Sequence, residues 1–244
     1  MEKQKYTYIK DGGDGYKTVD ISDIGQETGY HLAYHHDDEL YAGVWGLIDT
    51  TGNEVITPKY LFPLRFFDGV SVAVKGEWEY RKDWDGKYAG YWFKSNKIQY
   101  GLIDLKEKEI IPCQYSEVRE IWDCDDNGKD LIKYFAAFRN LYRGDEGEPG
   151  MAILDRDGNM VVDFIYSDCD YYISNNQLVV AIGGEMYGSA DVKCGVYDFR
   201  LGKEIVKPKY GDIEIEGYNL FRVSDDWEGD KDSYYLINEK EERV

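Results

Sequence analysis

Short apolar runs separated by turn-forming residues dominate the pattern of the chain. The clearest example is GVWGLIDTTGNEVITPKY at 43–60, where Gly46-Leu47-Ile48 is followed by Asp49, Gly52 and a second apolar run. An aspartate carboxylate can accept hydrogen bonds from backbone N–H groups two residues on, and glycine supplies the positive φ of a short turn. The stretch therefore predicts a β-hairpin with strands at 46–49 and 53–58. Proline cannot donate to a sheet ladder, so Pro58 is expected to end the pairing and turn the chain.

The tetrapeptide at 46–49 recurs along the chain. Related stretches begin at residues 101, 152 and 195, and a clipped copy occupies 235–238. Each of the four full copies is followed, at a nearly constant distance, by a tyrosine, and in three of them a proline lies shortly before it, with Phe164 in its place in the third. The positions that we assign to the structural repeat are Trp45, Gly46, Asp49, Gly52, Pro58, Tyr60, Gly101, Asp104, Pro112, Tyr115, Asp155, Gly158, Tyr166, Gly195, Asp198, Pro208 and Tyr210.

A third strand-like run follows each repeated tyrosine, at 69–76, 131–138, 177–182 and 218–223. Three short strands cannot bury both faces alone, so neighbouring repeats must share a core. The prediction is an all-β fold of tandem β-hairpin or three-stranded repeats, stacked as an elongated solenoid-like array, with a propeller-like ring as the alternative. An N-terminal segment (1–40) packs on or leads into the array (41–244), whose repeats lie near 41–98, 99–149, 150–192 and 193–233, with a partial one at 234–244.

The first repeat resembles the WG-repeat (KWG-repeat) family. AGVWGLIDTTGNEVITPKY followed by FFDGVSVAVKG is similar to the family pattern G-x-W-G-L-I-D-x-x-G-x-x-I-I-P-x-x-Y followed by F-x-x-G-x-A-x-V. Later repeats drift from it, since Trp45 becomes Tyr100, Met151 and Cys194, and Gly46 becomes Ala152. The resemblance implies repeated β-hairpins and a binding role without a catalytic site.

Composition and charge narrow the class of partner. The chain has 244 residues, 16% of them aromatic, and 48 acidic against 29 basic residues give a formal charge of −19. Aromatic residues favour strands, and an acidic surface disfavours nucleic acid and anionic membranes. The four cysteines show no metal or disulfide spacing, and no stretch approaches the roughly 18 apolar residues of a membrane helix. We expect a cytoplasmic monomer with reduced thiols.

The sequence contains only weak matches to metal-binding and catalytic motifs. His31, His35 and His36 cluster with Asp37 and Asp38, but no helix signature surrounds them to make a metal site. The stretch DCDDNGKD at 123–130 resembles the start of a calcium loop, yet its twelfth position is Tyr134 instead of glutamate, and a hairpin tip fits better. Catalytic motifs are missing from the sequence, so we expect no enzyme activity, no cofactor and no metal.

Two acidic stretches suggest a binding rim. DWDGK at 83–87 and DWEGD at 226–230 both follow a third strand of a repeat, so a regular array would place them at one edge. Aromatic residues can anchor a partner while carboxylates steer a basic one. The residues of this predicted acidic rim are Asp83, Trp84, Asp85, Asp226, Trp227 and Glu228. The competing interpretation is two long hairpins whose tryptophans pack on their own strands.

The expected function is a non-enzymatic protein–protein interaction module that binds a basic protein. One concrete form is an immunity-type protein of bacteria that neutralises a cationic toxin. The alternative is a carbohydrate- or cell-surface-binding repeat protein, which the aromatic content favours.

Overall fold

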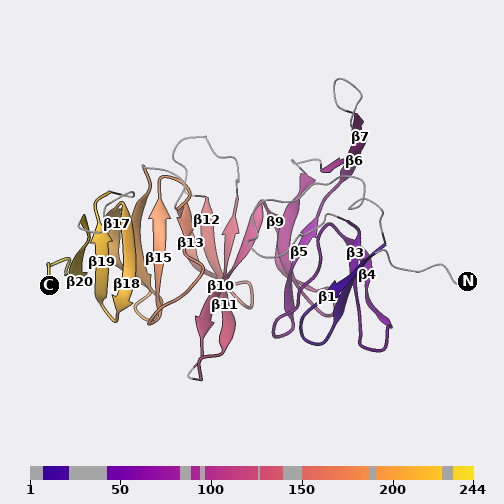
Figure 1. Cartoon of the computed structure of the whole chain (residues 1–244), viewed down its shortest axis with the longest axis horizontal. Helices are drawn as coiled ribbons and strands as arrows, with labels where there is room; N and C mark the ends of the chain where they lie inside the picture. Colours follow the sequence, from indigo (N-terminus) through magenta and orange to yellow (C-terminus); the bar gives the residue numbers. More distant parts are fainter. Residues whose placement is uncertain are drawn as a thin grey trace, which may run out of the picture. The chain divides into compact units, whose positions relative to one another are not determined.

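Only β-strands make up the named elements of the computed structural model, which describes residues 8–21, 43–82, 89–93, 97–125, 127–139, 150–186, 191–226 and 233–244. Figure 1 shows them as a series of small antiparallel sheets, none of which closes into a barrel. The predicted all-β class and repeat array are therefore confirmed. The chain divides into two compact units, Met1–Val118 and Arg119–Val244.

The N-terminal unit contains two sheets and a hairpin. The first sheet has four strands in the order β1 (Tyr8–Asp11), β2 (Lys17–Asp20), β3 (Trp45–Ile48) and β4 (Glu54–Tyr60). The second has the order β5 (Val70–Lys75), β8 (Gln99–Asp104) and β9 (Glu109–Tyr115), while β6 (Trp78–Lys82) pairs with β7 (Ala89–Phe93). The two sheets share a core of Leu47, Ile56, Tyr60, Leu64, Phe66, Ala73 and Ile103. Residues 8–20, which precede the first repeat, thus supply two strands of its sheet.

The C-terminal unit contains three sheets. The first has the order β10 (Glu117–Cys124), β11 (Asp130–Phe138), β12 (Met151–Asp155) and β13 (Met160–Tyr166). The second has the order β14 (Asp168–Cys169), β15 (Gln177–Ile182), β16 (Lys193–Asp198) and β17 (Lys203–Tyr210). The third has the order β18 (Asp212–Gly217), β19 (Leu220–Ser224) and β20 (Tyr235–Asn238). Apolar side chains of adjacent sheets form common cores, as expected of stacked repeats.

The third strand of each repeat pairs with the first strand of the next repeat. Val72 of β5 lies opposite Leu102 of β8, and Val179 of β15 lies opposite Val196 of β16. The same pairing joins β11 to β12 and β19 to β20. The predicted strands are present, and each sequence repeat contributes its strands to two different sheets. Each sequence repeat straddles two sheets, so neighbouring repeats are joined by backbone hydrogen bonds as well as by packing.

The returning strand does not end at its proline. In β4, pairing continues past Pro58 to Tyr60, which lies opposite Trp45, while Ile56 lies opposite Leu47. The returning strand therefore has more residues than the strand it faces, which is a β-bulge. The same irregularity occurs in β9, β13 and β17, each ending in its tyrosine opposite Tyr100, Met151 and Cys194. The expectation that Pro58 stops the pairing is wrong, because Pro58 lies within the bulge and the pairing resumes beyond it at Tyr60.

The bulge explains the glycine of the repeat. A Cβ added to Gly46 would lie 2.4 Å from the carbonyl oxygen of Ile56 and 2.7 Å from the nitrogen of Pro58. A Cβ added to Gly101 would lie 2.6 Å from the carbonyl oxygen of Ile111, and one added to Gly195 would lie 2.5 Å from that of Val206. The third repeat, which has Ala152 at this position, keeps the same bulge. The glycine thus allows a close approach of two backbones.

Trp45 is a core residue. Its side chain is fully buried, and the repeated tyrosines Tyr60, Tyr115, Tyr166 and Tyr210 are also buried. A Cβ on Gly43 would lie 2.7 Å from both Trp45 Nε1 and Asp20 Oδ2, which places the indole nitrogen beside that buried carboxylate. The tryptophan of the first repeat therefore stabilises the sheet and is not exposed to a partner.

We expect Trp45→Ala to lower the free energy of unfolding of the N-terminal unit by roughly 3–5 kcal/mol, because it removes a large buried ring. Urea denaturation followed by circular dichroism measures the change. Ile9→Ala, in the same sheet but 52% exposed, should change it by less than about 0.5 kcal/mol. Equal effects of the two substitutions would contradict the assignment of Trp45 to the core.

We expect Gly46→Ala to cost about 1–3 kcal/mol, because the added methyl group must push the returning strand away. Gly217→Ala is the matched control, since nothing lies within 4 Å of a Cβ at that position. Thermal unfolding of both variants checks the difference. A Gly46→Ala variant as stable as the wild type would mean that the bulge can relax as it does around Ala152.

Candidate functional site

The aspartates of the repeat accept hydrogen bonds within hairpin turns. Asp49 Oδ1 accepts hydrogen bonds from the backbone N–H groups of Thr51 (2.8 Å) and Asn53 (2.9 Å). Hydrogen bonds from the Thr51 hydroxyl and the Asn53 side-chain amide, together with these backbone ones, lower the Asp49 pKa to about 2. Asp104, Asp155, Asp198 and Asn238 make comparable turns. Their carboxylates and amide have structural partners and give no sign of a reaction.

Ion pairs join the turns of two repeats to the preceding returning strand. Lys59, next to Tyr60, pairs with Glu107 at 2.9 Å, and Lys209, next to Tyr210, pairs with Glu241. Both glutamates have a φ of 61°, at a turn position where the first and third repeats have Gly52 and Gly158. A residue with a side chain is strained at positive φ, whereas glycine is not. Each glutamate therefore introduces backbone strain at a position where glycine would be relaxed. These ion pairs link the returning strand of one repeat to the hairpin turn of the next.

Most of the predicted acidic rim lies outside the described residues. Asp83, Trp84, Asp85, Trp227 and Glu228 belong to that part of the chain. Asp226 is described: it is exposed after β19, and its backbone N–H donates to Ser224 Oγ at 3.3 Å. The rim therefore remains a prediction from the sequence.

The other candidate motifs either form local hydrogen bonds and ion pairs or lie outside the described ranges. His31, His35 and His36 fall outside them. Residues 123–130 connect β10 to β11, where Asp125 Oδ1 accepts from the N–H groups of Asn127 and Lys129 and Asp123 pairs with Lys133. All four cysteines are free.

The described ranges contain neither a cluster of metal ligands nor a helix of membrane-spanning length. No group of three or more His, Cys, Asp or Glu side chains there could hold a metal ion. No helix in the same ranges is long and apolar enough to cross a bilayer.

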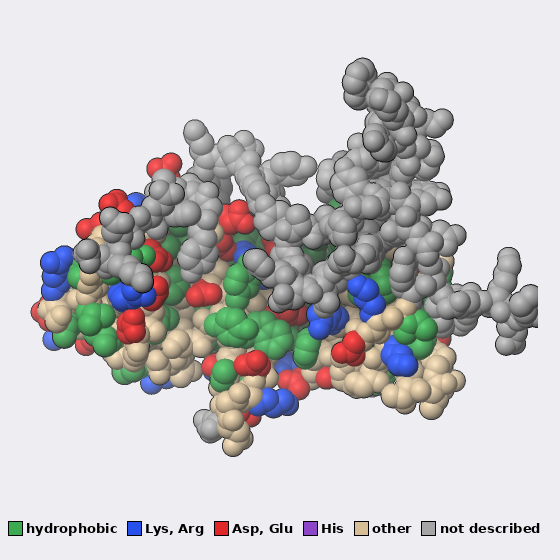
Figure 2. Space-filling view, viewed as in Figure 1, with side chains coloured by type: hydrophobic (Ala, Val, Ile, Leu, Met, Phe, Trp, Pro, Cys, Tyr) green, Lys and Arg blue, Asp and Glu red, His purple; other side chains and the backbone are tan. Residues whose placement is uncertain are grey.

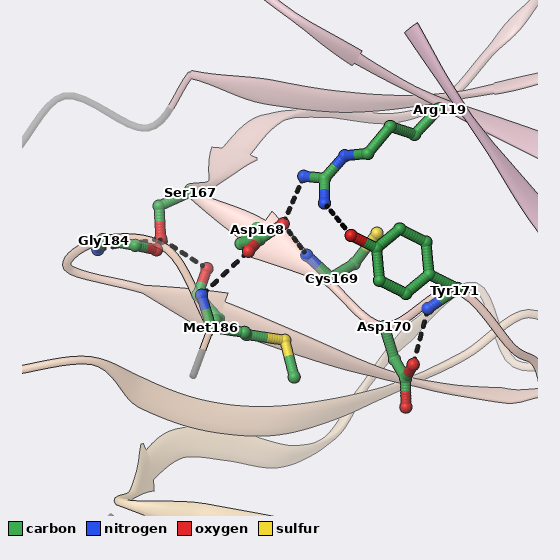
Figure 3. A network of polar contacts seen from close by, with 9 residues as sticks. Arg119, Ser167, Asp168, Cys169, Asp170, Tyr171, Gly184 and Met186 are labelled. Carbon is green, nitrogen blue, oxygen red and sulfur yellow. Dashed lines mark hydrogen bonds and ion pairs between the residues drawn. The ribbon is translucent and has the colours of Figure 1, made fainter. Parts of the chain in front are cut away.

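A buried ion pair organises the start of the second sheet of the C-terminal unit (Figure 3). Arg119, in β10, contacts the Asp168 carboxylate of β14 at 2.5 Å, and the two side chains are 13% and 4% exposed. The carboxylate also accepts from the backbone N–H groups of Cys169 (2.9 Å) and Met186 (2.8 Å). Asp168 thereby ties three segments together: β10, β14 and the turn that follows β15.

The same arginine holds an exposed tyrosine. Arg119 Nη1 donates to the hydroxyl of Tyr171 at 3.1 Å, and the guanidinium lies 4.2 Å from the centroid of the Phe138 ring and 5.4 Å from that of Tyr171. The backbone of the loop is also fixed, because Trp122 N donates to Tyr171 O and Ile173 N donates to Trp122 O, both at 2.8 Å. Tyr171 and Tyr172 are nevertheless 48% and 57% exposed. We call residues 170–173 the tyrosine loop.

An acid precedes these tyrosines. Asp170 Oδ1 accepts the backbone N–H of Tyr171 at 2.6 Å (Figure 3), and burial raises the Asp170 pKa above its usual value. Rigid, exposed aromatic rings lose little conformational entropy on binding and are frequent anchors of protein interfaces. The tyrosine loop is the candidate binding site that the described residues support best.

Sequence reasoning missed this loop. Its signal is the stretch SDCDYYIS at 167–174, in which two consecutive tyrosines follow two acids. In a chain with 23 tyrosines such a pair has no distinguishing feature. Only the structure shows that Arg119, which is far away in the sequence, holds one of the rings in place.

The acidic side chains are dispersed. Figure 2 shows them lying singly or in small groups among basic and apolar side chains over β15–β20 on the visible face. Most of the net negative charge nevertheless falls within the C-terminal unit. The negative charge is therefore spread over this face and does not mark out one site.

The fold defines an all-β repeat protein of small antiparallel sheets that share strands between repeats. A family model described as the WG containing repeat matches residues 45–77 and 100–123, which cover the first repeat and the start of the second. The chain thus carries WG-containing repeats, which confirms the resemblance seen in the sequence. The later repeats are defined by the recurrence of the same bulge and turn.

Other comparisons add little. A search among curated proteins finds no match. A solved structure, "Crystal structure of the eukaryotic initiation factor", is similar with a TM-score of 0.45 and 10% identity, over 99% of this chain and 54% of the other. The chain thus spans about half the length of that structure, and a likeness at this level carries no functional conclusion.

We expect Asp168→Asn to lower the free energy of unfolding of the C-terminal unit by about 3–5 kcal/mol, because it leaves the Arg119 charge buried without its counter-ion. Glu214→Gln, which breaks an exposed pair with Arg222, should cost less than about 1 kcal/mol. Chemical denaturation of both variants measures this. A small loss for Asp168→Asn would show that water reaches the guanidinium.

Proposed function

We propose that this repeat protein is a non-enzymatic module that binds a basic protein, with the tyrosine loop as one contact surface. The observation that supports this most strongly is the pair of exposed rings, Tyr171 and Tyr172, on a backbone fixed to β10 by hydrogen bonds. The Arg119–Asp168 pair adds rigidity at the base of the loop. A surface that is already ordered before binding loses less entropy when a partner docks.

The charge of the chain supports a basic partner. A formal charge of −19 attracts cationic proteins and speeds their association at low ionic strength. It opposes the binding of nucleic acids, whose phosphates repel acidic surfaces. We include the predicted acidic rim, residues 83–85 and 226–228, as a second contact region. An immunity-type role, in which the chain neutralises a cationic toxin in the cytoplasm, is the specific form we propose.

The repeats themselves favour binding over catalysis. The recurring polar residues make turns, and the recurring apolar and glycine residues make cores and bulges. Repeat arrays of this kind offer an extended surface for recognition because each repeat adds area beside the previous one. The function therefore belongs to residues that differ between repeats, and the tyrosine loop is such a place.

Carbohydrate binding is the second candidate, because exposed tyrosine rings also suit the flat faces of sugars. Tyr218, 53% exposed with the Arg200 guanidinium 4.3 Å from its centroid, is another such ring. A glycan array with no bound sugar, together with tyrosine and tryptophan fluorescence that oligosaccharides leave unchanged, would remove this candidate.

The experiment begins by capturing partners from the native host's lysate on the immobilised full chain, at low and high salt. A captured basic protein is then purified and titrated calorimetrically. We expect Tyr171→Ala with Tyr172→Ala to weaken binding at least tenfold, because interface aromatics carry much of the binding energy. Circular dichroism checks that the variant remains folded.

Charge-reversal variants distinguish binding by the predicted acidic rim from attraction by the overall negative charge. Changing Asp83, Asp85, Asp226 and Glu228 to lysine should weaken binding and flatten its salt dependence more than changing Asp157, Glu214, Glu216 and Glu239 to lysine. Both sets alter the net charge equally, so equal losses would show that the rim has no special role. Binding that neither the tyrosine nor the charge variants change would contradict the proposed function.

A further inference from the structure

The strand at the later edge of one sheet differs from the corresponding strands of the other sheets. The last strand in the order of each repeat sheet is β4, β9, β13, β17 or β20. Three of these contain a proline, namely Pro58 in β4, Pro112 in β9 and Pro208 in β17. Proline has no N–H to offer, so a foreign strand pairs poorly there.

The last edge is covered by the chain itself. Arg243 bridges to Ile237 of β20, and Val244 N donates to Leu236 O at 3.1 Å. The remaining edge, β13, reads MVVDFIY and has no proline. Within the described ranges it has β12 on one side and no strand on the other.

Two charged positions of β4 and β17 are apolar in β13. Where β4 and β17 have Glu54 and Glu204, β13 has Met160, and where they have Lys59 and Lys209, it has Ile165. Met160 is 49% exposed and Ile165 is 48% exposed. Charges and prolines on an edge strand prevent unwanted pairing, so their loss in one repeat only is a local change in what that edge can do.

Burial varies along β13. Val162 and Tyr166 are buried, whereas Val161, Asp163 and Ile165, at alternate positions, are exposed, the last two within the bulge between Val162 and Tyr166. The outward row is thus apolar, acidic, apolar, with one carboxylate at its centre. Such a row can be read by a strand laid beside it, whose own side chains at alternate positions lie next to these three.

We propose that β13 is a docking edge for an extended segment of a partner protein, which adds to the sheet as a further strand. The segment carries a lysine or arginine flanked, at alternate positions, by apolar residues, so that its cation lies beside Asp163. Backbone hydrogen bonds provide affinity in this mode of recognition, and the side-chain row provides selectivity. This rests on the proposed function and names the recognition element of the basic partner.

A second copy of the chain fits the edge less well. In a symmetric antiparallel pair centred on this strand, Asp163 would lie opposite Asp163 of the other copy. Like charges directly opposite each other destabilise a strand pair. The outward row is therefore suited to a basic heterologous strand.

The test uses the full chain and a fluorescently labelled, capped peptide, Thr-Val-Thr-Lys-Thr-Val-Thr, followed by fluorescence anisotropy. Phe164→Pro with Ile165→Lys restores the Pro-Lys-Tyr ending found in β4 and β17, which their sheets accommodate. We expect this double variant to weaken peptide binding at least tenfold. A peptide N-methylated at alternate residues, which cannot donate along one edge, should bind as weakly to the wild type.

A charge swap tests the selectivity. Asp163→Lys should reverse the preference between the lysine peptide and its glutamate counterpart by about two- to fivefold in each direction, the size of one cross-strand pair. The reciprocal change at β17, Pro208→Phe with Lys209→Ile, should create a new docking edge in the double variant. Thermal unfolding verifies that each variant folds.

Several results would overturn the proposal. They are peptide binding that N-methylation leaves unchanged, binding that the β13 double variant retains, and a preference that Asp163→Lys does not alter. Self-association in sedimentation experiments that the double variant abolishes would assign the edge to a second copy instead. A captured partner that loses affinity on changing Tyr171 and Tyr172, but not on changing β13, would contradict the edge and leave the proposed function intact.

Discussion

The array depends on one constraint, which is that the third strand of every repeat pairs with the first strand of the next. Val72 opposite Leu102 and Val179 opposite Val196 show this pairing in the two units. Because the sequence repeat straddles two sheets, no repeat can form a complete sheet alone. Backbone hydrogen bonds then couple neighbouring repeats, and buried residues such as Tyr60 and Tyr166 fill the cores between the sheets.

The residues that recur in the repeats have structural roles. The aspartates close hairpins, the glycines admit the bulge, and lysines such as Lys59 hold the turn of the following repeat. Function is then expected where one repeat departs from the rest. The third repeat departs twice, with apolar residues along β13 and with the tyrosine loop next to the Arg119–Asp168 pair (Figure 3).

Sequence reasoning located the strands of the repeats but did not show which of them share a sheet. The hairpin at 46–58, the third strands and the clipped copy at 235–238 follow from local apolar runs and turn residues, which act within a few positions of each other. The expected stop at Pro58 was wrong, because whether a proline ends a strand or enters a bulge depends on the strand opposite. The acidic rim was chosen from local composition, and all of it but Asp226 lies outside the described residues.

By itself, the sequence determined the all-β class, the hairpin turns and the net charge, because each depends on residue types and short spacings. The tertiary structure decided which strands share a sheet, that Trp45 is buried, and that Arg119 reaches Asp168 and Tyr171. It also showed that β13 is a sheet edge. These features depend on contacts between residues far apart in the chain, which local patterns of polarity do not specify.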